Sequence, residues 1–198
     1  MCGRGAAAGR LLAADGREVA YQLLEGGKKL ALRTALPANM ELRWQLVRGT
    51  PAATVPDAVV VAEVGANYEM TNGLAGVRVP RAAPVNDLLH LPAPVQGIRY
   101  HDGAWTATGP NLLAVQADAV HTMAVRFLER GPLVTTIEVS YAFDRPAWWN
   151  PSVAGRGREA GPGYYRSTIT LQAGQSSVLF EEDTDMDLSY SLNYYSGL

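Results

Sequence analysis

The chain has 198 residues, of which 47% are apolar and 18% are charged, and its formal net charge is -2. This apolar content suffices for one substantial core or two small ones, which excludes a disordered chain. The small net charge creates no long-range field, so we expect neither nucleic acid nor a membrane surface as partner. The single cysteine, Cys2, excludes an intrachain disulfide framework and an all-cysteine zinc site.

The first ten residues contain glycines and arginines but no apolar core of a signal peptide. No stretch approaches the roughly 20 apolar residues that a membrane-spanning helix needs. As written, the chain is therefore expected to be cytoplasmic. A longer parent protein could instead be extracellular or periplasmic.

The first fifty residues predict short hairpins joined by glycine turns. In the segment 41–47, apolar and polar residues alternate, and Leu42, Trp44 and Leu46 share one face that we expect to be buried. The segment 48–56 is rich in Gly, Thr, Pro and Ala, which is typical of a linker. We therefore predict a small β unit over 1–50, the end of a preceding β-domain, and a second module over 51–198.

The second module shows turn signals about every ten residues, which is typical of an antiparallel β-sandwich. Asn72-Gly73 is its strongest turn signal. A Pro-rich stretch, 80–94, and a long loop, 144–163, interrupt the pattern. Strand character exceeds helix character throughout, so the sequence predicts an all-β fold with little helix. The expected strands are 58–64, 67–71, 74–79, 96–100, 105–108, 120–129, 133–143, 164–172 and 176–182.

Two sets of segments resemble parts of a known architecture. The first set is similar to the closing hairpins of a small β-domain in large bacterial carbohydrate-active proteins: 17–22 (REVAYQ), 36–38 (LPA) and 44–46 (WQL). The second set is similar to the opening sheet of a super-β-sandwich: 68–74 (YEMTNGL), 76–79 (GVRV), 131–133 (GPL) and 165–171 (YRSTITL). Together they resemble galactose-mutarotase-like super-β-sandwich regions of glycoside hydrolases and of polysaccharide lyases of the exo-rhamnogalacturonan lyase type.

The resemblance implies an accessory carbohydrate-binding or structural module of a polysaccharide-degrading protein. In those families the catalytic groups usually lie on a helical toroid or in a later part of the sandwich, and no toroid is encoded here. We therefore expect no catalysis from this chain by itself. The chain could be a fragment of a longer protein.

The long loop 144–163 contains the residues most suited to binding a sugar. Aromatic rings pack against the C–H faces of sugars, and arginine binds carboxylates through a planar fork. Loops on a rigid sandwich often display binding residues. In the competing interpretation the tryptophans only cover the end of the core. The predicted ligand-binding residues are Trp148, Trp149, Asn150, Arg156 and Arg158.

The acidic segment 181–187 is a candidate calcium site. In an extended chain the alternating residues Asp183, Asp185 and Asp187 share one face, and Ca²⁺ prefers several oxygen ligands. The EF-hand pattern is absent, because Leu188 stands where that loop has its glycine. The alternative is an acidic strand edge that discourages pairing with other chains.

A second function class is a small glycan-active or ester-active hydrolase or lyase. Its site would lie in a sheet concavity with His101, Arg78 and Tyr165 as catalytic residues beside Gln96. No Gly-x-Ser-x-Gly elbow and no His-x-x-x-His pair supports this class. A third class is a structural β module that forms a homo-oligomer through exposed strand edges.

Overall fold

The computed structural model describes residues 9–82, 84–85, 91–106, 109, 111, 119–145, 147–149, 157–158 and 160–185. Every strand pairing within these residues is antiparallel. Helix is confined there to a single 3-10 turn, η1 (Glu25–Gly27). These features confirm the predicted all-β antiparallel fold. In the described part of the chain, no helix has the length and apolarity needed to cross a membrane.

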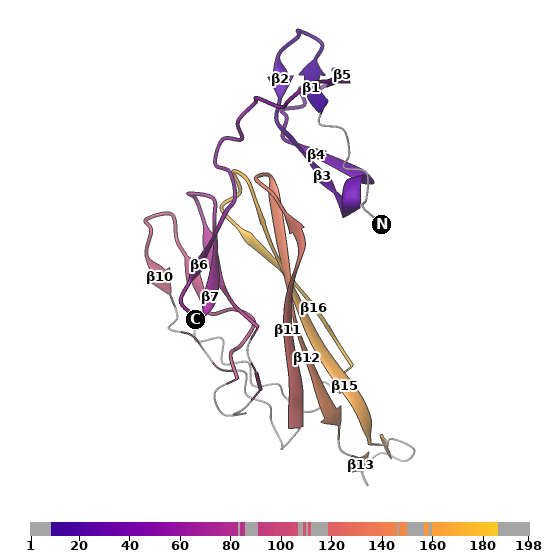
Figure 1. Ribbon diagram of the computed structural model, residues 1–198, viewed down its shortest axis with the longest axis vertical. Helices are drawn as coiled ribbons and strands as arrows, with labels where there is room; N and C mark the ends of the chain where they lie inside the picture. The colour runs from indigo at the N-terminus through magenta and orange to yellow at the C-terminus, as the bar shows by residue number, and fades with distance from the viewer. Residues whose placement is uncertain are drawn as a thin grey trace.

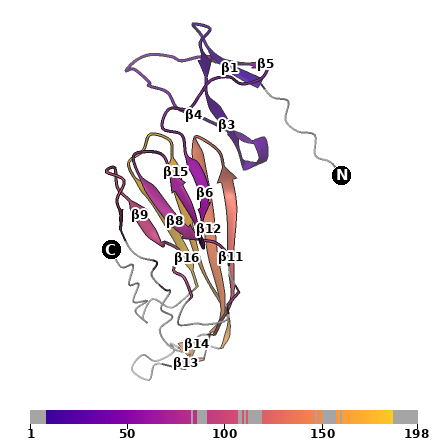
Figure 2. The same cartoon turned by 60° about the vertical axis from the view of Figure 1, so that its left-hand side comes forward.

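Two sheets face each other in the larger part of the molecule (Figures 1 and 2). The first sheet has the order β10-β9-β8-β7-β6, and the second has the order β11-β12-β15-β16. The strands of the first are β6 (Val60–Val64), β7 (Asn67–Thr71), β8 (Gly76–Pro80), β9 (Gly97–Arg99) and β10 (Trp105–Thr106). Those of the second are β11 (Ala119–Arg130), β12 (Val134–Arg145), β15 (Gly161–Gln172) and β16 (Val178–Thr184).

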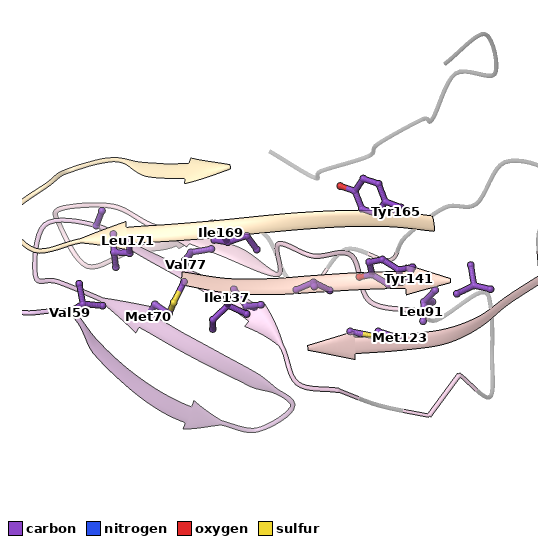
Figure 3. Close-up of a cluster of buried hydrophobic side chains, with 14 of the residues drawn as sticks. Val59, Met70, Val77, Leu91, Met123, Ile137, Tyr141, Tyr165, Ile169 and Leu171 are labelled. Carbon is purple, nitrogen blue, oxygen red and sulfur yellow. The ribbon is translucent and has the colours of Figure 1, made fainter. Parts of the chain in front are cut away.

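The core lies between these sheets and is built by strand alternation (Figure 3). Along β12, the residues Ile137, Val139 and Tyr141 are at most 1% exposed and point inward. Met70 and Val77 of the opposite sheet are fully buried against them. Successive side chains of a strand point to opposite faces, so the intervening positions of each strand form the outer faces. The prediction of a long strand with one wet face is confirmed for β11, whereas on the outer face of β12 Thr136 and Glu138 are buried.

The first five strands form two small sheets at one end of the sandwich (Figure 1). One sheet has the order β2-β1-β5, and the other is the hairpin β3-β4. We call residues 9–57, which contain these sheets, the N-terminal unit. Its strands are β1 (Gly9–Ala13), β2 (Glu18–Val19), β3 (Tyr21–Leu24), β4 (Lys29–Leu32) and β5 (Trp44–Arg48).

Two strands are more exposed than their sequences predict: the segment 41–47 is expected to bury one face, and the apolar segment 58–64 predicts a buried strand. In β5, Trp44 is 37% exposed and Leu46 is 57% exposed, so the prediction of a buried face is wrong. In β6, Val60 and Val64 are 59% and 47% exposed. Both strands lie at the edge of their sheets, where a neighbouring layer covers less of the side chain than it does in the centre. The alternation of apolar and polar residues predicts which side chains share a face of the strand. Whether that face is buried depends on the position of the strand in its sheet.

The prediction of a structureless loop over 144–163 is also wrong at its ends. Strand β12 continues to Arg145, and β15 begins at Gly161. Between them, β13 (Trp148–Trp149) and β14 (Gly157–Arg158) pair as a short ribbon. The ribbon lies at the end of the sandwich that is opposite to the N-terminal unit (Figure 1).

Candidate functional site

The outer face of the five-stranded sheet carries a row of three interacting side chains: Glu69 of β7, Arg78 of β8 and Trp105 of β10. Arg78 stands between the buried residues Val77 and Val79, so alternation turns it outward. Glu69 is its direct partner in the register, and β9 lies between Arg78 and Trp105. We call these three residues the outer-face row.

The members of the outer-face row hold one another in place. Arg78 Nε donates a hydrogen bond of 2.7 Å to Glu69 Oε1. The guanidinium carbon of Arg78 lies 4.1 Å from the ring centroid of Trp105, which is a cation–π contact. The side chains of Arg78 and Glu69 are 29% and 18% exposed, and Trp105 is half-buried. The row is therefore ordered and remains accessible to a ligand.

The terminal amino groups of Arg78 have no hydrogen-bond partner among the described residues. Arg99 faces the same side, because it stands directly opposite Trp105 in the register. The described residues contain no ion pair of Arg99 either. Two arginines and one glutamate therefore belong to the sheet face that carries the indole.

Gly97 of β9 makes room for this arrangement. A Cβ atom at this position would lie 3.5 Å from both Arg78 Cδ and Trp105 Cε3, and 2.9 Å from the carbonyl oxygen of Thr106. The last distance is shorter than real Cβ contacts allow. The glycine therefore lets β10 approach and lets the Arg78 and Trp105 side chains meet above β9.

The three residues proposed for catalysis are not brought together. His101 lies in the exposed turn between β9 and β10, and Arg78 lies on the outer face of that sheet. Tyr165 is 3% exposed between the two sheets, where its ring stacks on Tyr141 and its hydroxyl donates to Glu182 Oε1 at 2.8 Å. Strand alternation in β15 turns Tyr165 into the core, away from any outer-face site.

Gln96, expected near the same concavity, is 7% exposed and has a local structural role. Its Nε2 donates a hydrogen bond of 2.7 Å to the carbonyl of Ala93, and its backbone N–H donates to Arg78 O. These bonds fix the chain that leads into β9.

The predicted sugar-binding loop is described only in part. In the β13–β14 ribbon, Trp148 stands opposite Arg158 and Trp149 opposite Gly157. Asn150 and Arg156 lie outside the described residues. Binding by this loop stays a prediction.

The acidic segment engages protein donors. Asp183 Oδ2 accepts from Arg166 Nη1 at 3.4 Å, and Asp185 Oδ1 accepts from the backbone N–H of Tyr164 at 2.8 Å. The Tyr164 hydroxyl donates to Asp183, and this hydrogen bond raises the pKa of the tyrosine. Asp187 lies outside the described residues, and within them no group of three or more His, Cys, Asp and Glu side chains could hold a metal ion. Calcium binding stays a prediction.

A second accessible surface is a cleft of about 960 Å³ in the N-terminal unit, which contains Trp44. Its rim carries ion pairs between arginines and neighbouring acids, such as Arg43 with Glu41 at 2.9 Å. At its wall, Glu18 Oε1 accepts from the backbone N–H groups of Ala52 and Ala53. These hydrogen bonds, together with Arg10, hold the pKa of Glu18 below its usual range.

Sequence reasoning did not identify Trp105 and Glu69 as site residues. Both stand at strand positions that are compatible with an ordinary outer face, and 36 residues separate them along the chain. Correct pairing of β7, β8, β9 and β10 would have identified them, because this register aligns Glu69, Arg78 and Trp105 across the sheet. No protein-family model matches the chain, and no curated protein matches it either. The resemblance to galactose-mutarotase-like regions therefore stays a prediction from the sequence.

Proposed function

We propose that this chain is a carbohydrate-binding β-sandwich module of a polysaccharide-degrading protein, and that the outer-face row is its contact surface. One observation carries the proposal: an accessible indole is held against a guanidinium whose terminal amino groups have no protein partner among the described residues. This combination offers an apolar platform and directed hydrogen-bond donors on one rigid sheet.

The chemistry of the row suits a sugar. A pyranose has an apolar C–H face that packs on an aromatic ring, and its rim of hydroxyl groups accepts and donates hydrogen bonds. Arg78 provides donors and Glu69 provides an acceptor, and their mutual hydrogen bond reduces the entropy lost when a ligand binds. Strands position such groups more rigidly than loops do.

The proposal is tested by calorimetric titration with short soluble oligosaccharides from neutral and acidic polysaccharides. Trp105→Ala and Arg78→Met are expected to weaken binding about tenfold or more, since each removes a direct contact. Arg78→Met keeps much of the apolar stem and removes the N–H donors. Trp44→Ala in the N-terminal unit and Arg17→Met on its surface are the matched controls, and both are expected to retain binding.

Two results would contradict the proposal. Absence of binding across the neutral and acidic panel would refute carbohydrate recognition. Binding that survives Trp105→Ala but disappears in a Trp148→Ala, Trp149→Ala double variant would move the contact surface to the β13–β14 ribbon. Circular dichroism of each variant ensures that lost binding reflects the site and not an unfolded chain.

A further inference from the structure

Strand β5 forms an open edge of the N-terminal unit. It is the outermost strand of the sheet β2-β1-β5, in which it lies beside β1 (Figure 1). Trp44 and Leu46 are large apolar side chains with exposed fractions of 37% and 57%, and Arg48 is also exposed. Exposed edges with apolar side chains pair readily with other strands.

The direction of the backbone groups along β5 follows from its neighbours. The N–H of Ala13 donates to Arg17 O on the β2 side at 2.9 Å. Backbone N–H and C=O groups alternate in direction along a strand, so those of Leu12 point toward β5. Gln45 is the partner of Leu12 in β5, and its own backbone groups therefore point back toward β1. The N–H and C=O groups of Trp44, Leu46 and Arg48 consequently face the open edge.

The sequence of β5 is self-complementary when it pairs antiparallel with its own copy about Leu46. In this register Leu46 stands opposite Leu46 of the copy, and Trp44 stands opposite Arg48 at both ends. The three side chains lie on one face of the sheet, because they are two residues apart. The pairing would form about six backbone hydrogen bonds, a leucine contact and two cation–π contacts.

The unpaired positive charge of Arg48 favours a second copy of the chain as the partner of β5. The described residues contain no ion pair or hydrogen bond of its guanidinium. In the self-paired register an indole of the copy provides the ring that a guanidinium prefers. In this register the unpaired cation of one copy meets the exposed indole of the other.

The edge strands of the two sandwich sheets, and β2 at the other edge of the sheet β2-β1-β5, carry features that discourage pairing. Strand β16 presents three consecutive acids, Glu181, Glu182 and Asp183, which would repel a second copy. Strand β11 contains two register irregularities that disturb its edge. Strands β2 and β10 have two residues each. In β6 only two residues, Val61 and Glu63, direct their backbone N–H and C=O groups away from β7. Val64 and Asn67 flank a two-residue turn and pair with each other, so the backbone groups of every second residue from Val64 point toward β7.

We propose that two copies of this chain associate through β5, about a two-fold axis at Leu46, into a continuous sheet β2-β1-β5-β5-β1-β2. The interface is isologous, since each copy presents the same strand to the other. This association is independent of the carbohydrate site, which lies on the sandwich.

Sedimentation velocity over a range of protein concentrations tests the association. We expect a monomer–dimer equilibrium in which Leu46→Lys raises the dissociation constant by more than about tenfold, since two ammonium groups would face each other. Leu36→Lys is the matched control, because Leu36 is 69% exposed in the same unit and lies outside β5. Leu46 is exposed in the single chain, so its replacement is expected to preserve the fold.

Cross-linking tests the register. In a Cys2→Ser background, Leu46→Cys is expected to be cross-linked between copies by a short bismaleimide, because directly paired residues have Cα atoms about 5.5 Å apart. Leu36→Cys is expected to be cross-linked much less. A chain that stays monomeric at all concentrations would overturn the proposal. So would a Leu46→Lys variant that dimerises like the parent, or equal cross-linking by both cysteine variants.

Discussion

The side-chain amide of Asn72 joins the two sheets, because its Nδ2 donates a hydrogen bond of 2.6 Å to the carbonyl of Gln172. The same nitrogen donates to Gln175 O at 2.7 Å. Its Oδ1 accepts from the backbone N–H groups of Leu74 and Ala75. One residue that is 2% exposed thus closes the β7–β8 turn and ties it to the β15–β16 turn.

Asn72→Ala is expected to lower the free energy of unfolding by about 2 to 4 kcal/mol, because it leaves buried backbone donors and acceptors without partners. The measurement is urea unfolding followed by circular dichroism. Gln45→Ala, at an exposed amide side chain of β5, is the control and is expected to change stability little. A loss below about 0.5 kcal/mol for Asn72→Ala would show that water replaces these hydrogen bonds.

Gln22 connects the N-terminal unit to the sandwich in a similar way. Its Oε1 accepts from the N–H groups of Leu133 and Val134 at 3.0 and 2.9 Å, and its Nε2 donates to Val134 O at 2.8 Å. We expect Gln22→Ala to speed hydrogen exchange of both amides by about tenfold, because they lose their acceptor. Leu23→Ala, at an exposed neighbouring position, is the control. Unchanged exchange at Leu133 and Val134 would contradict this contact.

Four charged residues form a ladder across the outer face of the four-stranded sheet. Glu138, whose side chain is 8% exposed, accepts from Arg126 Nε at 2.8 Å and lies 3.2 Å from Arg166 Nε. Arg166 also contacts Asp183. Glu138→Ala is expected to destabilise the chain by about 1 to 3 kcal/mol, because it removes the shared carboxylate between two cations.

Chemical denaturation of Glu138→Ala checks this expectation, with Glu181→Ala on the exposed strand β16 as control. Arg126→Ala is expected to cost less than about 1 kcal/mol, since Arg126 is mostly exposed and Glu138 keeps Arg166. Equal losses for Glu138→Ala and Glu181→Ala would mean that the ladder contributes no more than an ordinary surface acid.

Glu18 makes the attachment of the linker sensitive to acid. Its pKa is lowered from the ordinary value of 4.5, chiefly by the hydrogen bond from Ala52 and then by the one from Arg10. A lowered folded-state pKa contributes stability above pH 4.5, and this contribution disappears as pH falls through the folded-state pKa. Hydrogen exchange of Ala52 and Ala53 is the readout.

We expect these amides to lose protection below pH 4.5, relative to the intrinsic exchange rate, before the core amides of β12 do. Glu18→Gln is the control, because it cannot ionise and its protection should not change in this range. Loss of protection at the same pH in both proteins would assign the acid effect to another group.

The sequence predicted the regular features of the sandwich well, because they depend on local chemistry. Asn72-Gly73 provided a turn, and Arg130-Gly-Pro separated two long alternating strands that the structure confirms as β11 and β12. The exposure of Trp44 could not be predicted from the same pattern, because alternation does not reveal that β5 is an edge strand.

The candidate site was less predictable than the fold. Arg78 was identified as a site residue, but with His101 and Tyr165, which lie on a turn and in the core. Its structural partners are Glu69 and Trp105. Each strand pairing brings together residues that are far apart in the sequence, and a slip of one residue would turn every side chain to the other face.

Local chemistry by itself determined that this chain forms antiparallel strands, where most of its turns lie and which side chains alternate. Only the tertiary structure decided which faces are covered, that Arg78 meets an indole, and that β5 remains open. The reason is physical: turn and alternation preferences act between near neighbours, whereas burial and register depend on which distant strands pair.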